Sequence, residues 1–326
     1  MHVLIKTLWP VFLLVMGAAA PLMAAQTFPS KPIRAVVTTP PGSGGDVVMR
    51  TIAQVLSEMY RQQVLVENRP GAGGLIGATA VATAPPDGYM IGLAGPAHVL
   101  APQLQAKPPY RPIEDFTPIV ELGTLSSVLV VGAGVPAKNT QELIALAKSK
   151  PGQLNYASLG DGTASHLAGA LFTQAAGINV VHVPFKSVAD VFQAVISGDV
   201  HYVNYLVPLA LPLLRDGKAR ALAVTGQVRF AALPDIPTMA EAGLPGANLD
   251  AMLGIVGPAN LPREIVQQLH ADIVAVLRRQ DTRERLATQA LMPSSGTATP
   301  DSYGAHLKAE YEVYRKLIAT LGLKRQ

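Results

Sequence analysis

Thr38 to Arg50, the stretch TTPPGSGGDVVMR, decides the fold because it joins the end of an apolar strand pattern to the start of an amphipathic helix pattern. Ser43 and Asp46 have the spacing of a capping box, in which side chains bond the first N–H groups of a helix. Glycines in the turn let a ligand approach the backbone closely, and a helix N-terminus attracts anions. The turn therefore predicts an anion site. Its candidate residues are Thr39, Pro41, Gly42, Ser43, Gly44 and Gly45.

The same residues also fit a plain helix cap that binds no ligand. In either case we assign Asp46 to the cap, because a carboxylate that faced an anionic ligand would repel it. Its expected role is to orient the backbone amides.

A second turn, Ser158 to His166 (SLGDGTASH), repeats this chemistry after another strand pattern and before another helix pattern. Its hydroxyl groups and amides are neutral donors that can surround an anion at low reorganisation cost. Two such turns can hold one small anion between them. The candidate residues here are Ser158, Gly160, Asp161, Gly162, Thr163 and Ser165.

Ser165, His166 and Asp161 also invite interpretation as a hydrolytic triad. We disfavour it, because neighbouring positions at a helix start diverge by about 100° and the sequence has no GxSxG elbow.

Two further segments supply candidates outside these turns. The segment from Gly95 to Val99 (GPAHV) follows a strand pattern, so Ala97 and His98 could line the same cleft. A buried structural histidine is the alternative for His98. Lys186, in the turn PFKS, is the best cation for the far end of a polycarboxylate, and a solvent-exposed lysine is the alternative.

Composition limits the class of protein. With 326 residues, 49% hydrophobic and 15% charged, the chain can form two α/β domains with full cores. The formal net charge is +4 without basic blocks, so nucleic-acid binding is not expected. The absence of cysteine excludes disulfides and thiolate nucleophiles, and the seven histidines lack metal-ligand spacing. We expect no metal and no cofactor.

Residues 1–25 have the pattern of a secretory signal, with Lys6 near the start, an apolar run from Leu8 to Val15, and small residues up to Ala25. The cleavage point stays open, since no clean Ala-x-Ala precedes Gln26. No later stretch reaches 18 uncharged apolar residues, so we expect no membrane helix in the mature chain, and an uncleaved anchor is the alternative. The sequence thus predicts an exported, periplasmic protein.

Strand and helix patterns alternate along the chain, which favours parallel sheets covered by helices. The apolar runs at 117–122 and 126–131 predict a strand that leaves one domain for another, and 251–256 would bring the chain back. The expected domains are residues 26–121 plus 253–326 and residues 122–252. Two crossing connections are typical of a hinged clamshell.

Short motifs run in order along nearly the whole mature chain: PPGSGGD, VENRPGAGG, APPDGY, DFTPI, LNYASLGDGTASHLAG, HVPFK, KARALAVTG and LPDIPTMAEAGLPG. Together they resemble the Bug receptor family, the extracytoplasmic solute receptors of tripartite tricarboxylate transport systems. The resemblance implies a two-domain type II periplasmic binding protein fold that closes on a small carboxylate. It also implies that the turns Pro40 to Asp46 and Ser158 to Ser165 pinch one carboxylate group, partly through ordered waters.

The chain departs from the family pattern at three places. Thr39 replaces the usual aromatic residue before the double proline, and Leu75 replaces a common asparagine after the GAGG turn. Tyr205 and Leu206 stand where an Asp-Asn pair is common. If that aspartate faces the ligand, its loss removes a partner for an ammonium group. We therefore hypothesise a carboxylate without an amino group, with an apolar or aromatic body, and include Tyr205 among the candidate binding residues.

The sequence thus predicts a solute-binding receptor that is not an enzyme, and that delivers a small organic carboxylate to the membrane subunits of a tripartite tricarboxylate-type transporter. The alternatives are a periplasmic ligand sensor for a histidine kinase and, ranked lower, an exported hydrolase. A monomer is expected, since a clamshell must move freely.

Overall fold

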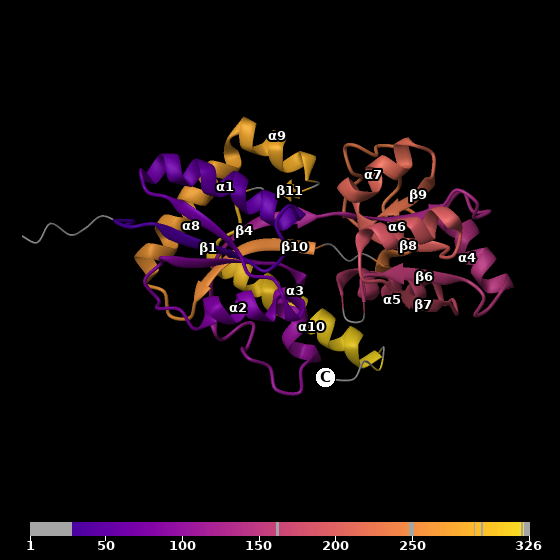
Figure 1. Cartoon of the computed structure of the whole chain (residues 1–326), viewed down its shortest axis with the longest axis horizontal. Coiled ribbons are helices and arrows are strands. Elements are labelled where there is room, and N and C mark those ends of the chain that lie inside the picture. Colours follow the sequence, from indigo (N-terminus) through magenta and orange to yellow (C-terminus); the bar gives the residue numbers. More distant parts are fainter. Residues whose placement is uncertain are drawn as a thin grey trace, which may run out of the picture.

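The chain forms two α/β lobes that lie side by side along its longest axis (Figure 1). The structure is a computed structural model that describes residues 28–160, 163–247, 251–289, 291–294, 296–320 and 322. The signal-like segment, Asp161 and Gly162 lie outside the described residues.

The first lobe contains a six-stranded sheet in the order β11-β4-β10-β3-β1-β2. The strands are β1 (Ile33–Val37), β2 (Val64–Asn68), β3 (Met90–Ala94), β4 (Phe116–Leu125), β10 (Ala251–Pro258) and β11 (Leu291–Pro293). The helices around it are α1 (Gly44–Tyr60), α2 (Leu75–Ala82), α3 (Pro96–Leu100), α8 (Arg263–Arg278), α9 (Gln280–Thr288) and α10 (Pro300–Thr320).

The second lobe contains a five-stranded sheet in the order β7-β6-β8-β5-β9. The strands are β5 (Ser127–Gly132), β6 (Asn155–Ser158), β7 (Val181–Pro184), β8 (Tyr202–Leu206) and β9 (Ala219–Val224). The helices are α4 (Thr140–Ser149), α5 (Ala164–Ala176), α6 (Val188–Ser197) and α7 (Val207–Arg215).

Both sheets are mixed, so the expectation of parallel sheets is wrong for the strands next to the crossings. β1 is parallel to β2 and β3, but β10 is antiparallel to β3 and β4. In the second lobe β5 is antiparallel to β8 and β9. The reason is the direction of entry, because β5 and β10 each come into a lobe from the other lobe, against the direction of that lobe's β-α-β units.

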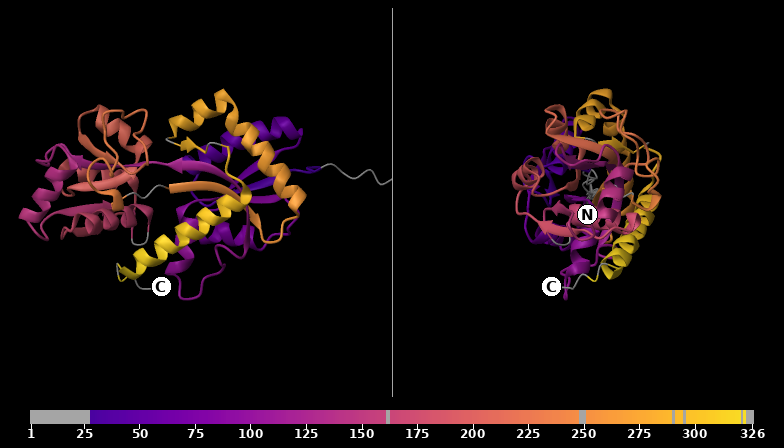
Figure 2. Two further views of the ribbon diagram at one scale, coloured as in Figure 1. Left: turned by 180° about the vertical axis from the view of Figure 1, so that it is seen from behind. Right: turned by 90° about the vertical axis from the view of Figure 1, so that its right-hand side faces the viewer.

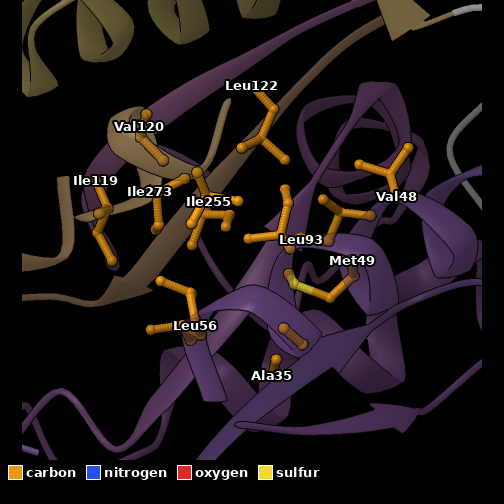
Figure 3. Close-up of a cluster of buried hydrophobic side chains, with 14 of the residues drawn as sticks. Ala35, Val48, Met49, Leu56, Leu93, Ile119, Val120, Leu122, Ile255 and Ile273 are labelled. Carbon is orange, nitrogen blue, oxygen red and sulfur yellow. The ribbon is translucent and has the colours of Figure 1, made fainter. Parts of the chain in front are cut away.

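The sequence places Val48, Ile52, Val55, Leu56 and Met59 on one side of the helix expected at 46–60, and the core of the first lobe confirms most of this face. Val48 and Leu56 are buried in one hydrophobic cluster with Ala35 and Leu93 of the sheet and Ile273 of α8 (Figure 3). Met59, in the last turn of α1, is 44% exposed.

Several elements differ from the sequence expectations. The pattern predicts a turn from Gly95 to Val99, but α3 begins there with Pro96 in its first turn, where a missing N–H costs nothing. The prolines between Pro102 and Pro118 predict an extended connection, but a 3₁₀ helix occupies Ala101–Leu104 at its start and β4 begins at Phe116. α7, with two prolines, and the short elements α9 and β11 were not expected from the pattern.

β4 and β10 form the passage between the lobes. β4 ends at Leu125, and after Ser126 the chain enters the second sheet as β5. The expected domain boundaries at 121/122 and 252/253 fall inside β4 and β10, and we keep this division of the chain as a proposal.

Candidate ligand-binding site

Strand register places the carboxyl ends of both sheets on the sides where the lobes meet. Ser127 opens β5 directly after the crossing and pairs with Leu206, the last residue of β8. In the first lobe Gly254, near the start of β10, pairs with Ala94, the last residue of β3. The helices that follow β1 and β6 therefore begin at these facing edges, where ligands of α/β sheets bind. Figure 1 shows the first turns of α1 and α5 on the facing sides.

Ser43 and Asp46 close the first turn as its sequence predicts, except that Asp46 bonds the N–H of Gly42 and not that of the N-cap, Ser43, which donates to Pro40 O. Ser43 is the N-cap of α1, and its Oγ accepts a hydrogen bond from Asp46 N at 3.3 Å. Asp46 Oδ2 accepts one from Gly42 N at 2.8 Å. Thr39 Oγ1 lies 2.6 Å from Ser43 Oγ, which ties the hydroxyls of the turn together. Pro40, Pro41 and Gly42 are exposed, Thr39 and the residues from Ser43 to Gly45 are half-buried, and Asp46 is buried.

Asp46 is held from three directions, which confirms its assignment to the cap. Its carboxylate is 2% exposed and also accepts hydrogen bonds from Arg50 Nε and from Asn68 Nδ2, at 3.0 and 2.8 Å. Burial alone would raise the pKa of Asp46, but the hydrogen bonds from Arg50, Gly42 and Asn68 outweigh burial and lower it. Asn68 also donates to Thr39 O, so it fixes the turn from the end of β2.

Asp46→Ala is expected to lower the free energy of unfolding by about 2–3 kcal/mol at pH 7, since it removes a cap and leaves buried donors without an acceptor. Because the folded pKa is lowered, this stabilisation is complete above the unfolded pKa near 3.8 and is lost as pH falls through the folded value. Urea unfolding of wild type and variant between pH 7 and pH 2.5 measures both.

Asp216→Ala is the matched control, because Asp216 forms an exposed ion pair with Lys218. It should change stability by less than about 0.5 kcal/mol. A difference between wild type and Asp46→Ala that stays constant down to pH 2.5 would contradict the linkage.

These capping hydrogen bonds leave two backbone N–H groups of the first turn available to a ligand. Asp46 N is taken by Ser43 and Gly42 N by Asp46, whereas Gly44 N and Gly45 N have no acceptor among the described residues. Both lie at the positive end of the α1 dipole. A Cβ added at Gly44 would meet nothing within 4 Å, so the surroundings of this position are open.

The second turn is built in the same way. Thr163 is the N-cap of α5 and its Oγ1 accepts from His166 N at 3.3 Å, while Ser165 Oγ accepts from Leu159 N at 3.0 Å. Within the described part of the chain, Ala164 N and Ser165 N have no acceptor. Ser158 is fully buried, and its Oγ accepts from Gly160 N.

The strand pattern around His182 predicts a structural role for this histidine, and it supports the second turn from the neighbouring strand β7. Its Nε2 lies 2.6 Å from Ser158 Oγ, and its ring stacks on His166 with the centroids 4.0 Å apart. The His166 ring therefore packs against the His182 ring, and Ser165 Oγ accepts a hydrogen bond from within the turn. This arrangement gives the hydrolytic interpretation no support.

A buried leucine joins the second turn to the first lobe. Leu167, fully buried in the first turns of α5, belongs to a hydrophobic cluster whose other buried members, including Val36, Ala94 and Leu317, come from the first lobe. Figure 2 shows from behind how α10, which carries Leu317, runs toward the second lobe. The first turns of α5 thus pack against the first lobe.

The structure places Ala97 and His98, the candidates from the segment after β3, in different surroundings. Ala97 lies beside the first turn's strand, since a Cβ added at Gly74 would meet both Thr38 and Ala97. His98 fits its structural alternative: it is 5% exposed, its Nε2 lies 2.9 Å from Pro112 O, and its ring packs edge-on against Phe116. Burial lowers the pKa of His98 to about 4, so the ring is neutral.

Lys186 and Tyr205 are the remaining candidates. Lys186 is exposed, in agreement with the alternative that we kept open for it. Tyr205 is 5% exposed and packs edge-on against Phe192 of α6, and burial raises its pKa to about 12. Its ring thus belongs to the packing between β8 and α6.

A pocket of about 590 Å³ lies elsewhere, between the proline-rich segment and α10. Tyr110, Ile113 and Tyr311 line it, and no residue of the two turns does. Within the described ranges no cluster of histidine, aspartate and glutamate side chains could hold a metal ion, and no helix is long and apolar enough to span a membrane.

Comparison with known proteins points to one family. A model described as tripartite tricarboxylate transporter family receptor matches residues 48–323. Protein BugT of Bordetella pertussis is 32% identical over 320 residues, which cover 96% of this chain and 96% of BugT.

Solved structures agree. The periplasmic binding protein BugD superposes with a TM-score of 0.77 at 30% identity, covering 92% of this chain and all of BugD. Rpa4515 of R. palustris with adipate gives 0.79 at 31% identity, with 90% and 98% covered. MatC of Rhodopseudomonas palustris with bound malate gives 0.76 at 31% identity, with 89% and 100% covered. The two lobes are therefore those of a two-domain periplasmic binding protein, as the motifs implied.

Proposed function

This chain belongs to the tripartite tricarboxylate transporter receptor family, a family of solute-binding receptors rather than enzymes, and from this premise we propose that it captures a small organic carboxylate between its two lobes. The ligand is held by the first turns of α1 and α5 and is delivered to the membrane subunits of a tripartite tricarboxylate-type transporter.

One observation carries the proposal: each facing helix offers two backbone donors that have no acceptor among the described residues, Gly44 and Gly45 on α1, Ala164 and Ser165 on α5. Four amides at two positive helix ends suit the oxygens of a carboxylate. Such fixed dipoles bind more strongly where closing lobes exclude water.

The ligand lacks an amino group. Tyr205 and Leu206 stand where the family often has an Asp-Asn pair, and Tyr205 packs against α6 through its ring. Neither Tyr205 nor Leu206 supplies a carboxylate that could bind an ammonium group. Two relatives carry adipate and malate, which are carboxylates without amino groups, and this supports the same class here.

The protein acts outside the cytoplasmic membrane as a monomer, after loss of its first 25 or so residues. The relative BugD is a periplasmic binding protein, and the N-terminal pattern of this chain favours export. A histidine kinase sensor would use the same site, and co-purification with a membrane kinase instead of a transporter would favour it.

The mature protein is expected to gain thermal stability with at least one acid of a mono-, di- and tricarboxylate panel, by mass action on the folded state. Calorimetry then compares aspartate with succinate and glutamate with glutarate, and the deaminated member of each pair should bind tighter. Tighter binding of the amino acid would contradict the ligand class. A panel without any shift would contradict carboxylate binding itself.

A further inference from the structure

β8 holds a buried amide that the fold leaves without partners. Asn204 is 2% exposed, and neither its Nδ2 nor its Oδ1 has a hydrogen-bond partner in the structure. Buried polar side chains are nearly always hydrogen-bonded, and an unsatisfied one calls for an explanation. Among the described residues the other unsatisfied side-chain atoms are single oxygens of Thr282, Tyr303 and Glu310, whereas Asn204 leaves its donor and its acceptor both unused.

Strand register places this amide at the edge of the second sheet, below the second turn. β6 and β8 are parallel, with Tyr156 opposite Tyr202 and Ala157 opposite Val203, so Ser158 and Asn204 lie at the same level one step further. Side chains alternate along a strand, which puts Asn204 on the same face as Tyr202. Tyr202 contacts Phe172 and Thr173 of α5, so this face is the one that α5 covers.

Asn204 therefore lies beside Ser158, at the carboxyl end of the sheet and on the side of the α5 N-terminus. The unbonded amides of Ala164 and Ser165 and the unpartnered carboxamide of Asn204 belong to one end of the sheet. The first pair attracts an anion, and the carboxamide is neutral with one donor group and one acceptor.

We propose that Asn204 is a specificity-determining residue that binds a hydroxyl group of the carboxylate ligand, so that the receptor prefers hydroxy acids. This inference rests on the proposed function, because it names the class of acid bound at the same site. A hydroxyl can accept from Nδ2 and donate to Oδ1, which satisfies both atoms. An ammonium group has only donors, and a methylene group satisfies neither atom.

The burial of the site favours the same group. Because Asn204 is 2% exposed and Ser158 is fully buried, a ligand group that bonds this amide is removed from water. A second carboxylate at that depth would lose its hydration without a cation to compensate, whereas a hydroxyl loses little.

The test compares acids that differ by one hydroxyl, using calorimetry on the mature wild-type protein. The pairs are malate and succinate, 3-hydroxybutyrate and butyrate, and mandelate and phenylacetate, with both enantiomers of each hydroxy acid. In at least one pair the hydroxy acid should bind about 10-fold or more tightly than its deoxy partner, because a site built for a hydroxyl discriminates against its absence.

Asn204→Leu should reduce that preference to about 3-fold or less, while the affinity for the deoxy acid stays within about 3-fold. Without ligand the variant should melt about 2–4 °C higher, since it removes an unsatisfied amide from the interior. Thr173→Val is the matched control: it removes a half-buried hydroxyl of α5 that lies 3.0 Å from the hydroxyl of Tyr202, two residues before Asn204 on the same face of β8, and it should leave the preference unchanged.

The outcomes separate this inference from the proposed function. If acids bind but wild type shows no preference for the hydroxy form, or if Asn204→Leu keeps the full preference, the role of Asn204 is refuted and carboxylate binding stands. If no acid binds, both fail. If Asn204→Leu does not fold, Asn204→Val takes its place. The wild-type comparison still tests the preference for hydroxy acids.

Discussion

Gly44→Glu is expected to weaken carboxylate binding by about 100-fold or more without unfolding the protein. Gly44 is the first residue of α1, its N–H is one of the two unbonded amides of the first turn, and an added Cβ meets nothing within 4 Å. A glutamate there puts a negative charge where the ligand's charge must lie. At about 4 Å two like charges repel by roughly 4 kcal/mol near a protein surface, which exceeds the 100-fold loss.

The same charge is favourable for the helix itself, since an acidic residue in the first turn complements the helix dipole. Binding and stability should therefore separate, with the melting temperature of the ligand-free variant equal to or above that of wild type. The measurements are calorimetry with the best acid of the panel and thermal unfolding without ligand.

Gly44→Gln is the matched control, because it adds the same bulk without charge. If electrostatics dominates, Gly44→Gln should reduce the binding free energy by no more than about a tenth of the reduction caused by Gly44→Glu. Equal losses for both variants would show that bulk, not charge, blocks the site, and unchanged binding in Gly44→Glu would remove the first turn from the site.

Glu310→Gln is expected to stabilise the protein strongly above pH 8. Glu310 of α10 is half-buried, and Tyr314 donates to its Oε1 at 3.2 Å, whereas its Oε2 is shielded from solvent and has no partner among the described residues. Burial raises the pKa of Glu310 to about 8, the hydrogen bond from Tyr314 lowers it, and the nearby Glu121 adds to the increase. Glutamine has the shape of the protonated acid and cannot ionise.

The direction of the pH dependence follows from linkage. Because the folded pKa is above the unfolded value of 4.5, the stability of the wild type is highest below pH 4.5 with respect to this group. It is lost progressively as pH rises to the folded value near 8. The difference amounts to on the order of 5 kcal/mol, so variant and wild type should be equally stable at pH 4 and clearly different at pH 8.5.

Urea unfolding between pH 4 and pH 9 measures this difference. Glu312→Gln is the control on the same helix, because Glu312 pairs with Arg315 at the surface, and its pH profile should follow that of wild type. Parallel profiles for wild type and Glu310→Gln over the whole range would show that Glu310 is ionised in the folded protein.

The two capped turns were predictable because each is closed by side chains close in sequence. Ser43 bonds the N–H three residues on, and Thr163 does the same in the second turn. The sequence did not reveal that Asn68 and His182 hold these turns from 22 and 24 positions away. It kept a structural role open for His98, and the ring's contacts with Pro112 and Phe116 support that role.

The sequence pattern could not predict the directions of the strands next to the crossings either. The apolar run of β10 looks the same in a parallel and in an antiparallel pairing, and only its pairing with Ala94 and Leu125 fixes its direction. The burial of Asn204 was equally unpredictable. In the sequence it is a single polar residue in an apolar strand, and only the packing of the sheet and α5 buries it.

By itself, then, the sequence determined the alternation of strands and helices, the caps of α1 and α5, and, through the order of its motifs, the family. These depend on interactions within a few residues, or on composition, which each segment carries with it. Only the tertiary structure decided that the two helix starts face each other, that Leu167 packs into the first lobe, and that Asn204 and the Oε2 of Glu310 are shielded from solvent. Such features depend on contacts between distant segments, which exist only once both sheets have packed.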